Sequence, residues 1–283
     1  MSVKVITDST SYIDPTLQKE LDITVIPLSV NFPDESFKET EVDYDYFYNK
    51  IETTGIIPTS SQPSPGDIYN RFKALVEEGH EIVAMFISSL MSGTYETALA
   101  VRDRILSEMP NANIAVLDSK TNCMSLGYPV IEAARTALNG SSLCQVSDLA
   151  SSLSERMHFY FTPASLEYLL KGGRIGGAAN LISHVLKIRP ILFVDNGRTN
   201  VYRISRNFRG AVDEILKKVD KDYKNKGLRQ VFVHHINYPE KAVEIAAKLK
   251  ERYGMEAPIL SIGPIIGLHV GPGAVGVVYC TES

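Results

Sequence analysis

Short apolar runs alternate with amphipathic stretches through the first half of the chain, and this alternation restricts the possible folds more than any other feature. The apolar runs are Val3–Thr7, Ile23–Val30, Glu81–Ser88 and Asn113–Leu117, and the amphipathic stretches include Tyr69–Glu78 and Thr94–Glu108. Strand–helix–strand alternation of this kind predicts a parallel α/β sheet. Ligands of such sheets bind beyond the carboxyl ends of the strands.

Polar residues stand at three of those strand ends. Asp8 to Ser11 follow the first run, Ser88 and Ser89 end the third, and Asp118 and Ser119 follow the fourth. Because parallel strands end at the same edge of a sheet, we expect a polar site there.

The second half has a different pattern, beginning near Met157. We expect strands at His158–Phe161, Pro190–Val194 and Thr199–Ile204, and helices at Phe208–Tyr223 and Glu240–Tyr253. Asn196-Gly197 between two apolar runs predicts a hairpin, since both residues tolerate positive φ. The sequence therefore predicts a parallel α/β N-terminal domain at 1–157 and a mixed α+β C-terminal domain at 158–283.

Composition excludes several classes of protein. The net charge of −4 gives no sign of a nucleic-acid-binding surface. The three cysteines and six histidines show neither disulfide nor metal-ligand spacing, so we expect reduced thiols and no metal site. No charged region followed by an apolar run opens the chain, so we expect a cytoplasmic protein.

The apolar stretch from Ala257 to Cys280 resembles a membrane span in hydropathy alone. Pro258, Pro264, Pro272 and five glycines interrupt it. We therefore expect two buried strands around a Gly-Pro-Gly turn in place of a membrane helix.

Two hydroxyl-rich motifs precede predicted helices. In Pro58–Asp67, Ser64 suits an N-cap and Pro65 the first helical position, but capping leaves Thr59-Ser60-Ser61 unexplained. In Ser88–Tyr95, Ser92 and Gly93 open the next helix. Both are compatible with simple capping, and both also suit an anion at the positive end of a helix.

Two glycine-rich motifs follow later in the chain. In Leu166–Gly176, ordinary C-capping accounts for Gly172 and Gly173 but not for Arg174 between the glycines. In Gly267–Gly276, His269 is either a core histidine or a donor to an anion, with tight backbone around its ring.

Taken in order, these motifs resemble the DegV family of bacterial proteins. The matching elements run from Thr7–Ser11 through Ser60–Pro63, Ser92–Tyr95, Asp118-Ser119 and Leu166–Gly176 to Gly267–Gly276. The resemblance implies a two-domain α/β protein that buries a long-chain fatty acid in the cleft between its domains. Members of the family serve as the lipid-binding subunit of a bacterial fatty acid kinase, whose separate ATP-using subunit forms an acyl-phosphate for phospholipid synthesis.

Carried over to this chain, the resemblance implies that Ser60, Ser92 and His269 hold the carboxylate. Family members commonly have threonine at the position of Ser60, and serine keeps the hydroxyl. Arg174, and Arg203 or Arg206, would support the head group or face the kinase subunit. The full set of expected ligand-binding residues is Ser60, Ser61, Ser92, Gly93, His269, Arg174 and Ile266, the last with Ile265 and Leu268 along the acyl tail.

These expectations describe a carrier that is not catalytic alone and needs no cofactor other than its bound fatty acid. Its partners would be the fatty acid and the kinase subunit, and the resemblance leaves room for transient membrane contact. Two alternatives stay open. Ser92, His269 and Asp118 could form a hydrolase triad, although the chain lacks a Gly-x-Ser-x-Gly elbow. The chain could also carry another small anionic lipid.

Overall fold

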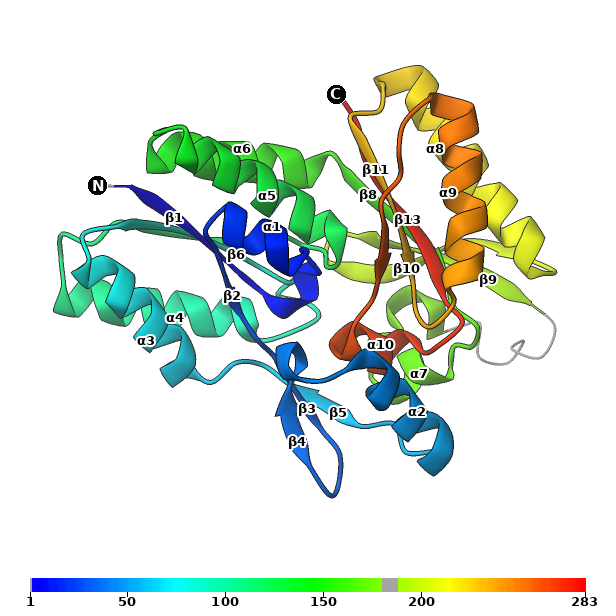
Figure 1. The fold of residues 1–283 in the computed structure, drawn as a ribbon, viewed down its shortest axis with the longest axis horizontal. Coiled ribbons are helices and arrows are strands. Elements are labelled where there is room, and N and C mark those ends of the chain that lie inside the picture. Colours follow the sequence, from blue (N-terminus) through cyan, green and yellow to red (C-terminus); the bar gives the residue numbers. More distant parts are fainter. Residues whose placement is uncertain (1, 180–187) are drawn as a thin grey trace. The chain divides into compact units, whose positions relative to one another are not determined.

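The computed structural model describes residues 2–179 and 188–283, and within it the chain forms two compact units. Unit 1 contains Met1–Ser29, Phe37–Thr40 and Ser60–Glu155, and unit 2 contains Val30–Ser36, Glu41–Thr59 and Arg156–Ser283. Two segments of the predicted N-terminal range, 30–36 and 41–59, therefore cluster with unit 2, which the chain enters again at Arg156 (Figure 1).

Unit 1 is built on a four-stranded sheet in the order β2-β1-β6-β7, and every neighbouring pair is parallel. The strands are β1 (Val3–Asp8), β2 (Ile23–Ile26), β6 (Glu81–Phe86) and β7 (Ile114–Asp118). The helices are α1 (Pro15–Glu20), α3 (Pro65–Glu77), α4 (Thr94–Glu108), α5 (Met124–Leu138) and α6 (Leu143–Glu155), with short 3-10 turns at Ser9–Ser11 and Glu39–Glu41. The predicted parallel α/β sheet is confirmed.

The core of unit 1 lies between its sheet and helices α3 and α4. Ile6, Phe72 and Phe86 are fully buried in it, together with Ala98 and Ile105 on α4. The buried apolar residues of α4, which are Ala98, Val101 and Ile105, recur at helical spacing and face this core. Helices α5 and α6 pack against each other, and α5 also packs on β1.

Unit 2 is built on a six-stranded sheet in the order β10-β9-β8-β13-β11-β12, in which only β11 and β12 pair in parallel. The strands are β8 (Met157–Thr162), β9 (Arg189–Asp195), β10 (Arg198–Ser205), β11 (Gln230–His235), β12 (Ile259–Ser261) and β13 (Val275–Cys280). The helices are α2 (Tyr44–Thr54), α7 (Glu167–Lys171), α8 (Phe208–Lys226), α9 (Pro239–Tyr253) and α10 (Pro264–Val270). This mixed sheet confirms the predicted α+β class.

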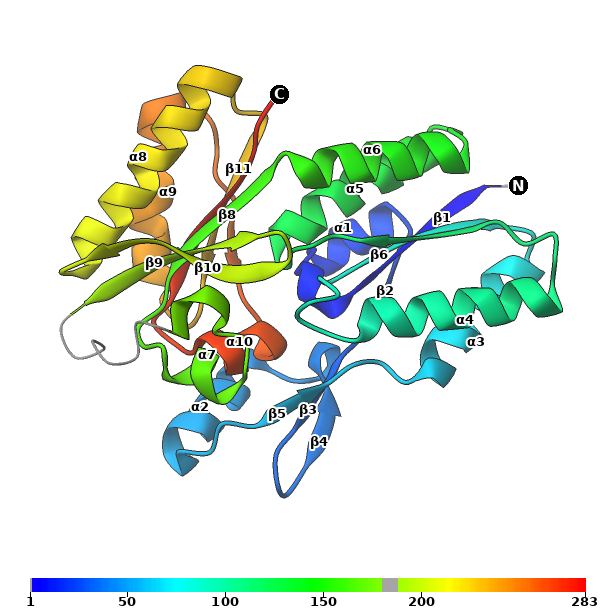
Figure 2. The ribbon, with the colours of Figure 1, turned by 180° about the vertical axis from the view of Figure 1, so that it is seen from behind.

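Helices α8 and α9 lie side by side over one face of the unit 2 sheet (Figure 2). Their apolar residues, among them Ile215, Val219 and Ile245, form one core with Tyr160 and Tyr279 of the sheet. The predicted hairpin is confirmed, because β9 and β10 pair across Asn196 and Gly197, which have φ of 47° and 81°.

A third sheet consists of three short strands in the order β4-β3-β5: β3 (Ser29–Asn31), β4 (Ser36–Lys38) and β5 (Thr59–Ser61). The single strand expected at Ile23–Val30 is therefore wrong. The structure has β2 and β3 there, separated around Pro27, which lacks the N–H that a continuous ladder would need.

The expected strand before the Gly-Pro-Gly turn is also largely wrong. Only Ile259–Ser261 is extended, and Pro264–Val270 is helix α10. Pro264 occupies the first helical turn, where its missing N–H costs nothing, and Gly271 ends the helix with φ of 86°. The second expected strand is present as β13. Within the described residues, no helix is both long and apolar enough to cross a membrane.

Candidate functional site

The polar ends of strands β1 and β6 are joined by the carboxylate of Asp8. Its Oδ1 accepts hydrogen bonds from the backbone N–H of Thr10 at 2.9 Å and from Thr10 Oγ1 at 2.5 Å. Its Oδ2 accepts a bond from the N–H of Ile87 at 2.7 Å. Burial raises the pKa of Asp8, and the three hydrogen bonds oppose that effect. Asp8 thus fixes the loops at this edge of the sheet.

Asp118, at the end of β7, has a similar structural role. Its Oδ2 accepts a bond from Ser89 Oγ at 2.6 Å, and its Oδ1 accepts bonds from the N–H groups of Ser89 and Lys120 at 3.2 and 2.9 Å. Both carboxylate oxygens are therefore engaged by neighbouring loops. This engagement does not favour Asp118 as the residue that would orient a triad histidine.

The first two motifs meet at the start of α4. Gln62 Nε2 donates to Thr97 Oγ1 at 2.6 Å, and a Cβ added to Gly93 would overlap Gln62 Oε1. The side chain that follows Ser60 and Ser61 therefore lies directly against Gly93. The sequence motifs around residues 60 and 92, thirty residues apart, form one cluster in unit 1.

Ser92 belongs to the same cluster. Its Oγ is 2.9 Å from Thr94 Oγ1 and accepts a weaker bond from the N–H of Thr94 at 3.4 Å. The helix begins after Gly93, which supplies no side-chain cap. The start of α4 therefore has the hydroxyls of Ser92 and Thr94 beside backbone N–H groups at the positive end of a fifteen-residue helix, an environment that favours an anion.

The capping interpretation of Ser64 is confirmed, and it explains part of the first motif. Ser64 Oγ accepts a bond from the N–H of Asp67 at 3.0 Å, and Pro65 begins α3. The hydrogen bond with Ser64 and the nearby Lys38 ammonium lower the pKa of Asp67.

The third and fourth motifs meet in unit 2. A Cβ added to Gly172 would overlap Nδ1 of His269, so the ring lies directly on the backbone that ends α7. Arg174 is exposed, and its Nη1 donates to the carbonyl of Gly172 at 2.7 Å. His269 lies near the end of α10, and the buried side chain of Ile266 is one turn before it.

The His269 ring is neutral at pH 7. Burial lowers its pKa to about 4, and the positive charge of Arg174 adds to that effect. A neutral imidazole still has one N–H to donate. A carboxylate placed beside the ring would favour its protonated form and raise this pKa.

The other two predicted arginines lie away from the His269 cluster in sequence. Arg203 is exposed on β10, donates to Glu214 Oε2 at 3.0 Å and stacks over Tyr202 at 5.5 Å. Arg206 is exposed just after β10. The contacts of Arg203 and the exposed position of Arg206 do not indicate that either arginine binds the ligand.

Three buried hydroxyl and amide oxygens follow two strands of unit 1, and of them the sequence pointed only to Ser11, as part of the polar end of the first strand. Ser11 Oγ, Thr121 Oγ1 and Asn122 Oδ1 have no hydrogen-bond partner within residues 2–179 and 188–283. They follow β1 and β7, the strands whose ends carry Asp8 and Asp118. Only their position after an apolar run could have pointed to Thr121 and Asn122.

Two further observations concern ligand groups and cavities. No cluster of three or more potential metal ligands is found among the residues that the structure describes, and no disulfide joins any of the three cysteines there. A cleft of about 320 Å³ opens in unit 1 beside Ser2, Lys4, Glu81 and Ser141. None of the predicted site residues lines it.

Comparisons with known proteins agree with these motifs. A family model described as "Uncharacterised protein, DegV family" matches residues 2–282. A DegV domain-containing protein of Clostridium acetobutylicum is 44% identical over 282 residues, which is 100% of this chain and 99% of that protein. Protein DegV of Bacillus subtilis is 32% identical over 286 residues, covering 99% of each chain.

Solved structures give the same result. A stearic acid-binding protein from Eubacterium ventriosum superposes with a TM-score of 0.91 at 26% identity, covering 99% of this chain and 98% of the other. DegV of Bacillus subtilis, described as a fatty acid binding protein, superposes with a TM-score of 0.90 at 30% identity, covering 99% of each chain. The fold is therefore the one found in these fatty acid-binding proteins.

Proposed function

Because this chain belongs to the DegV family, we propose that it binds a long-chain fatty acid and presents its carboxylate to a separate kinase subunit for acyl-phosphate formation. The observation that carries the proposal is the pairing of motifs. Ser60–Gln62 meets Ser92-Gly93 at the start of α4, and Gly172–Arg174 meets His269 at the end of α10. Each pair joins donors of hydrogen bonds, which a carboxylate requires when it leaves water.

The physical chemistry of the first cluster suits a carboxylate. Hydroxyls of Ser60, Ser61 and Ser92 are neutral donors, so no buried positive charge is needed to hold the anion. The positive end of α4 adds about 0.3–1 kcal/mol for a charge near its first turn. His269 supplies a further N–H donor. A nearby anion would raise the pKa of the ring and favour its protonated form, whose positive charge would strengthen that hydrogen bond.

An acyl chain gains its affinity from burial. Each methylene removed from water contributes about 0.8 kcal/mol, so a chain of about sixteen carbons gains on the order of 10 kcal/mol before ordering costs. Ile265, Ile266 and Leu268 are all buried on α10 beside His269 and are our candidates for lining the tail. Placement of the fatty acid between the two domains belongs to the same proposal.

The binding step is tested with Ser92→Ala and His269→Ala. Each removes one hydrogen-bond donor to a charged group, so each should raise the Kd for palmitate about tenfold or more. Isothermal titration calorimetry measures the affinity, and thermal unfolding checks that the fold survives. Ser64→Ala is the matched control, because Ser64 is a helix cap outside the proposed ligand set. Wild-type affinity in both site variants would reject the proposed carboxylate site.

The transfer step concerns Arg174, which is exposed beside the His269 cluster. We propose that it faces the ATP-using subunit and that this chain is a carrier, not catalytic alone and without a cofactor. Arg174→Ala should then bind palmitate normally but slow acyl-phosphate formation when a fatty acid kinase subunit and ATP are added. Equal rates for the variant and the wild type would reject that role.

A further inference from the structure

Helix α2 lies against the segment that begins α10, and one hydroxyl makes the contact. Tyr48 is buried, and its hydroxyl donates to the carbonyl of Ile262 at 2.9 Å, with the carbonyl of Gly263 at 3.4 Å. Gly263 is the N-cap of α10, and its carbonyl accepts the N–H of Gly267 at 2.9 Å. The Tyr48 hydroxyl therefore contacts the backbone at the point where α10 starts.

The same hydroxyl also contacts α10 one turn further on. A Cβ added to Gly267 would overlap the Tyr48 oxygen, so this glycine leaves the space that the hydroxyl fills. Gly267 is two residues before His269 on a helix of seven residues. Both contacts lie within two helical turns of His269, so a shift of the backbone at Gly263 or Gly267 would displace the His269 ring.

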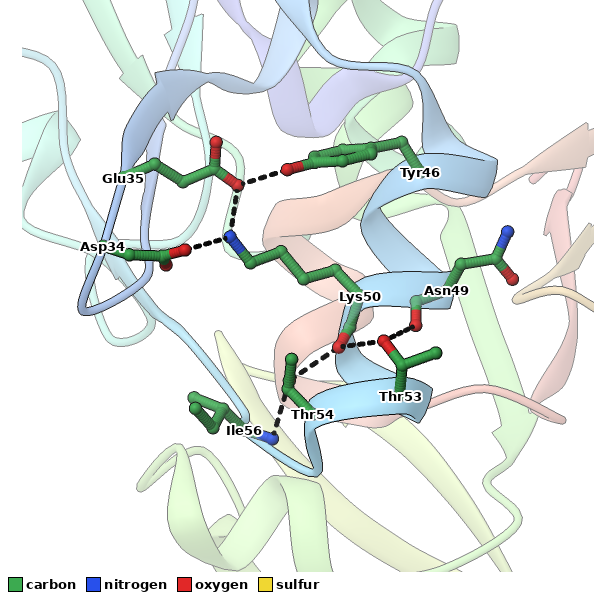
Figure 3. Close-up of polar contacts among 8 residues, drawn as sticks. All are labelled: Asp34, Glu35, Tyr46, Asn49, Lys50, Thr53, Thr54 and Ile56. Atoms are coloured by element: carbon green, nitrogen blue, oxygen red, sulfur yellow. Dashed lines mark hydrogen bonds and ion pairs between the residues drawn. The ribbon is translucent and has the colours of Figure 1, made fainter.

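The opposite side of α2 is held by charged contacts. Lys50 Nζ pairs with Asp34 Oδ2 and Glu35 Oε1, both at 2.7 Å, and Tyr46 donates to the same Glu35 oxygen at 2.7 Å (Figure 3). Lys50 also lies 4.7 Å over the ring of Phe32. These contacts fasten α2 to the loop between β3 and β4, so α2 is fixed on one side while Tyr48 bears on α10 on the other.

We infer that Tyr48 is a positioning residue for His269, setting the place of α10 and therefore the direction of the histidine donor toward the ligand carboxylate. The inference rests on the proposed function for its ligand. It assigns a role in fatty acid affinity to a side chain of α2, about 220 residues before the histidine in sequence.

The test is Tyr48→Phe, with Tyr46→Phe as the matched control. Both variants remove one tyrosine hydroxyl from the same helix, but Tyr46→Phe leaves the Lys50 pairs in place and does not touch α10. Tyr48→Phe should raise the Kd for palmitate about fivefold, corresponding to about one hydrogen bond of net energy, whereas Tyr46→Phe should bind as the wild type does.

Coupling to His269 separates positioning from general destabilisation. In the His269→Ala background, adding Tyr48→Phe should cause no further loss of affinity, because the group that Tyr48 positions is gone. Independent, multiplicative losses, or an equal loss in Tyr46→Phe, would overturn the inference.

A readout without ligand keeps the inference distinct from the proposed function. The ring signal of His269 in a ¹H–¹³C NMR spectrum, and its titration, should change in Tyr48→Phe and stay unchanged in Tyr46→Phe. An unchanged His269 signal in Tyr48→Phe would overturn the inference. Failure of the wild type to bind palmitate would count against the proposed function alone.

Discussion

Replacement of Gly172 by alanine tests the contact between this glycine and the His269 ring. The backbone of Gly172 is in a conformation that alanine adopts easily, so the change adds a methyl group without straining φ. That methyl would overlap Nδ1 of His269 and would lie 3.0 Å from its Cε1. The imidazole is a rigid ring and must move by about 1 Å to restore ordinary van der Waals separation.

The size of the effect follows from this displacement. Overpacking of a well-packed site costs about 1–3 kcal/mol of folding stability. A misdirected His269 also loses a hydrogen bond to a charged ligand, which is worth about 1.5–3 kcal/mol, or about a ten- to hundredfold rise in Kd. We therefore expect Gly172→Ala to fold, with a lowered free energy of unfolding and a much weakened affinity for palmitate.

Calorimetric titration and urea denaturation measure the two effects separately. Gly254→Ala is the control, because Gly254 caps α9 with φ of 67° and has open space around it. Gly254→Ala should lose about 1 kcal/mol of stability, because alanine is strained in the left-handed backbone conformation, and should keep full affinity for palmitate. Wild-type affinity for palmitate in Gly172→Ala, or an equal loss of affinity in Gly254→Ala, would contradict this prediction.

Two further predictions concern buried polar groups. Asp8→Ala leaves the N–H groups of Thr10 and Ile87 without their acceptor and should lower the free energy of unfolding by about 2–4 kcal/mol. Asp8→Asn keeps one acceptor oxygen and should lose less stability. Equal urea midpoints for the two variants would contradict this prediction. Burial lowers the pKa of His234 to about 4, so this histidine is protonated in the unfolded chain at a higher pH than in the folded chain. The free energy of unfolding should therefore fall as the pH drops from about 6.5 toward 4, by up to about 1.4 kcal/mol per pH unit. His234→Gln should have a shallower dependence of unfolding free energy on pH over that range, and an unchanged slope would count against the assignment.

Local signals predicted the elements that local chemistry decides. Thr94–Glu108 was predicted with the bounds that α4 has, because its apolar residues recur at helical spacing and Gly93 precedes it. Ser64 was predicted as a cap, and Asn196-Gly197 as a turn, from side-chain and backbone properties of those residues alone.

Elements decided by contacts distant in sequence could not be predicted. Helix α10 is short, apolar and rich in glycine, so it has no periodicity that separates a buried helix from a buried strand. The clustering of α2 with unit 2 depends on Tyr48 and its partners near residue 262, over two hundred residues away. No local pattern reports such a contact.

The candidate site divides in the same way. Each motif was found from its own residues, because hydroxyls before a helix and glycines around one charged residue are visible locally. Only the structure shows that the Gln62 side chain lies against Gly93 and that the His269 ring lies against Gly172. The sequence shows only that Asp8 and Asp118 stand at the ends of strands. Their hydrogen bonds in the structure show that they connect the neighbouring loops.

Native mass spectrometry of the purified protein decides whether this chain carries a fatty acid, as we propose. The spectrum is recorded before and after solvent extraction, and the extract is analysed for lipid. We expect one long-chain fatty acid per chain, which is lost on extraction and regained on incubation with palmitate. A chain that stays empty after incubation with a panel of fatty acids would contradict the proposal.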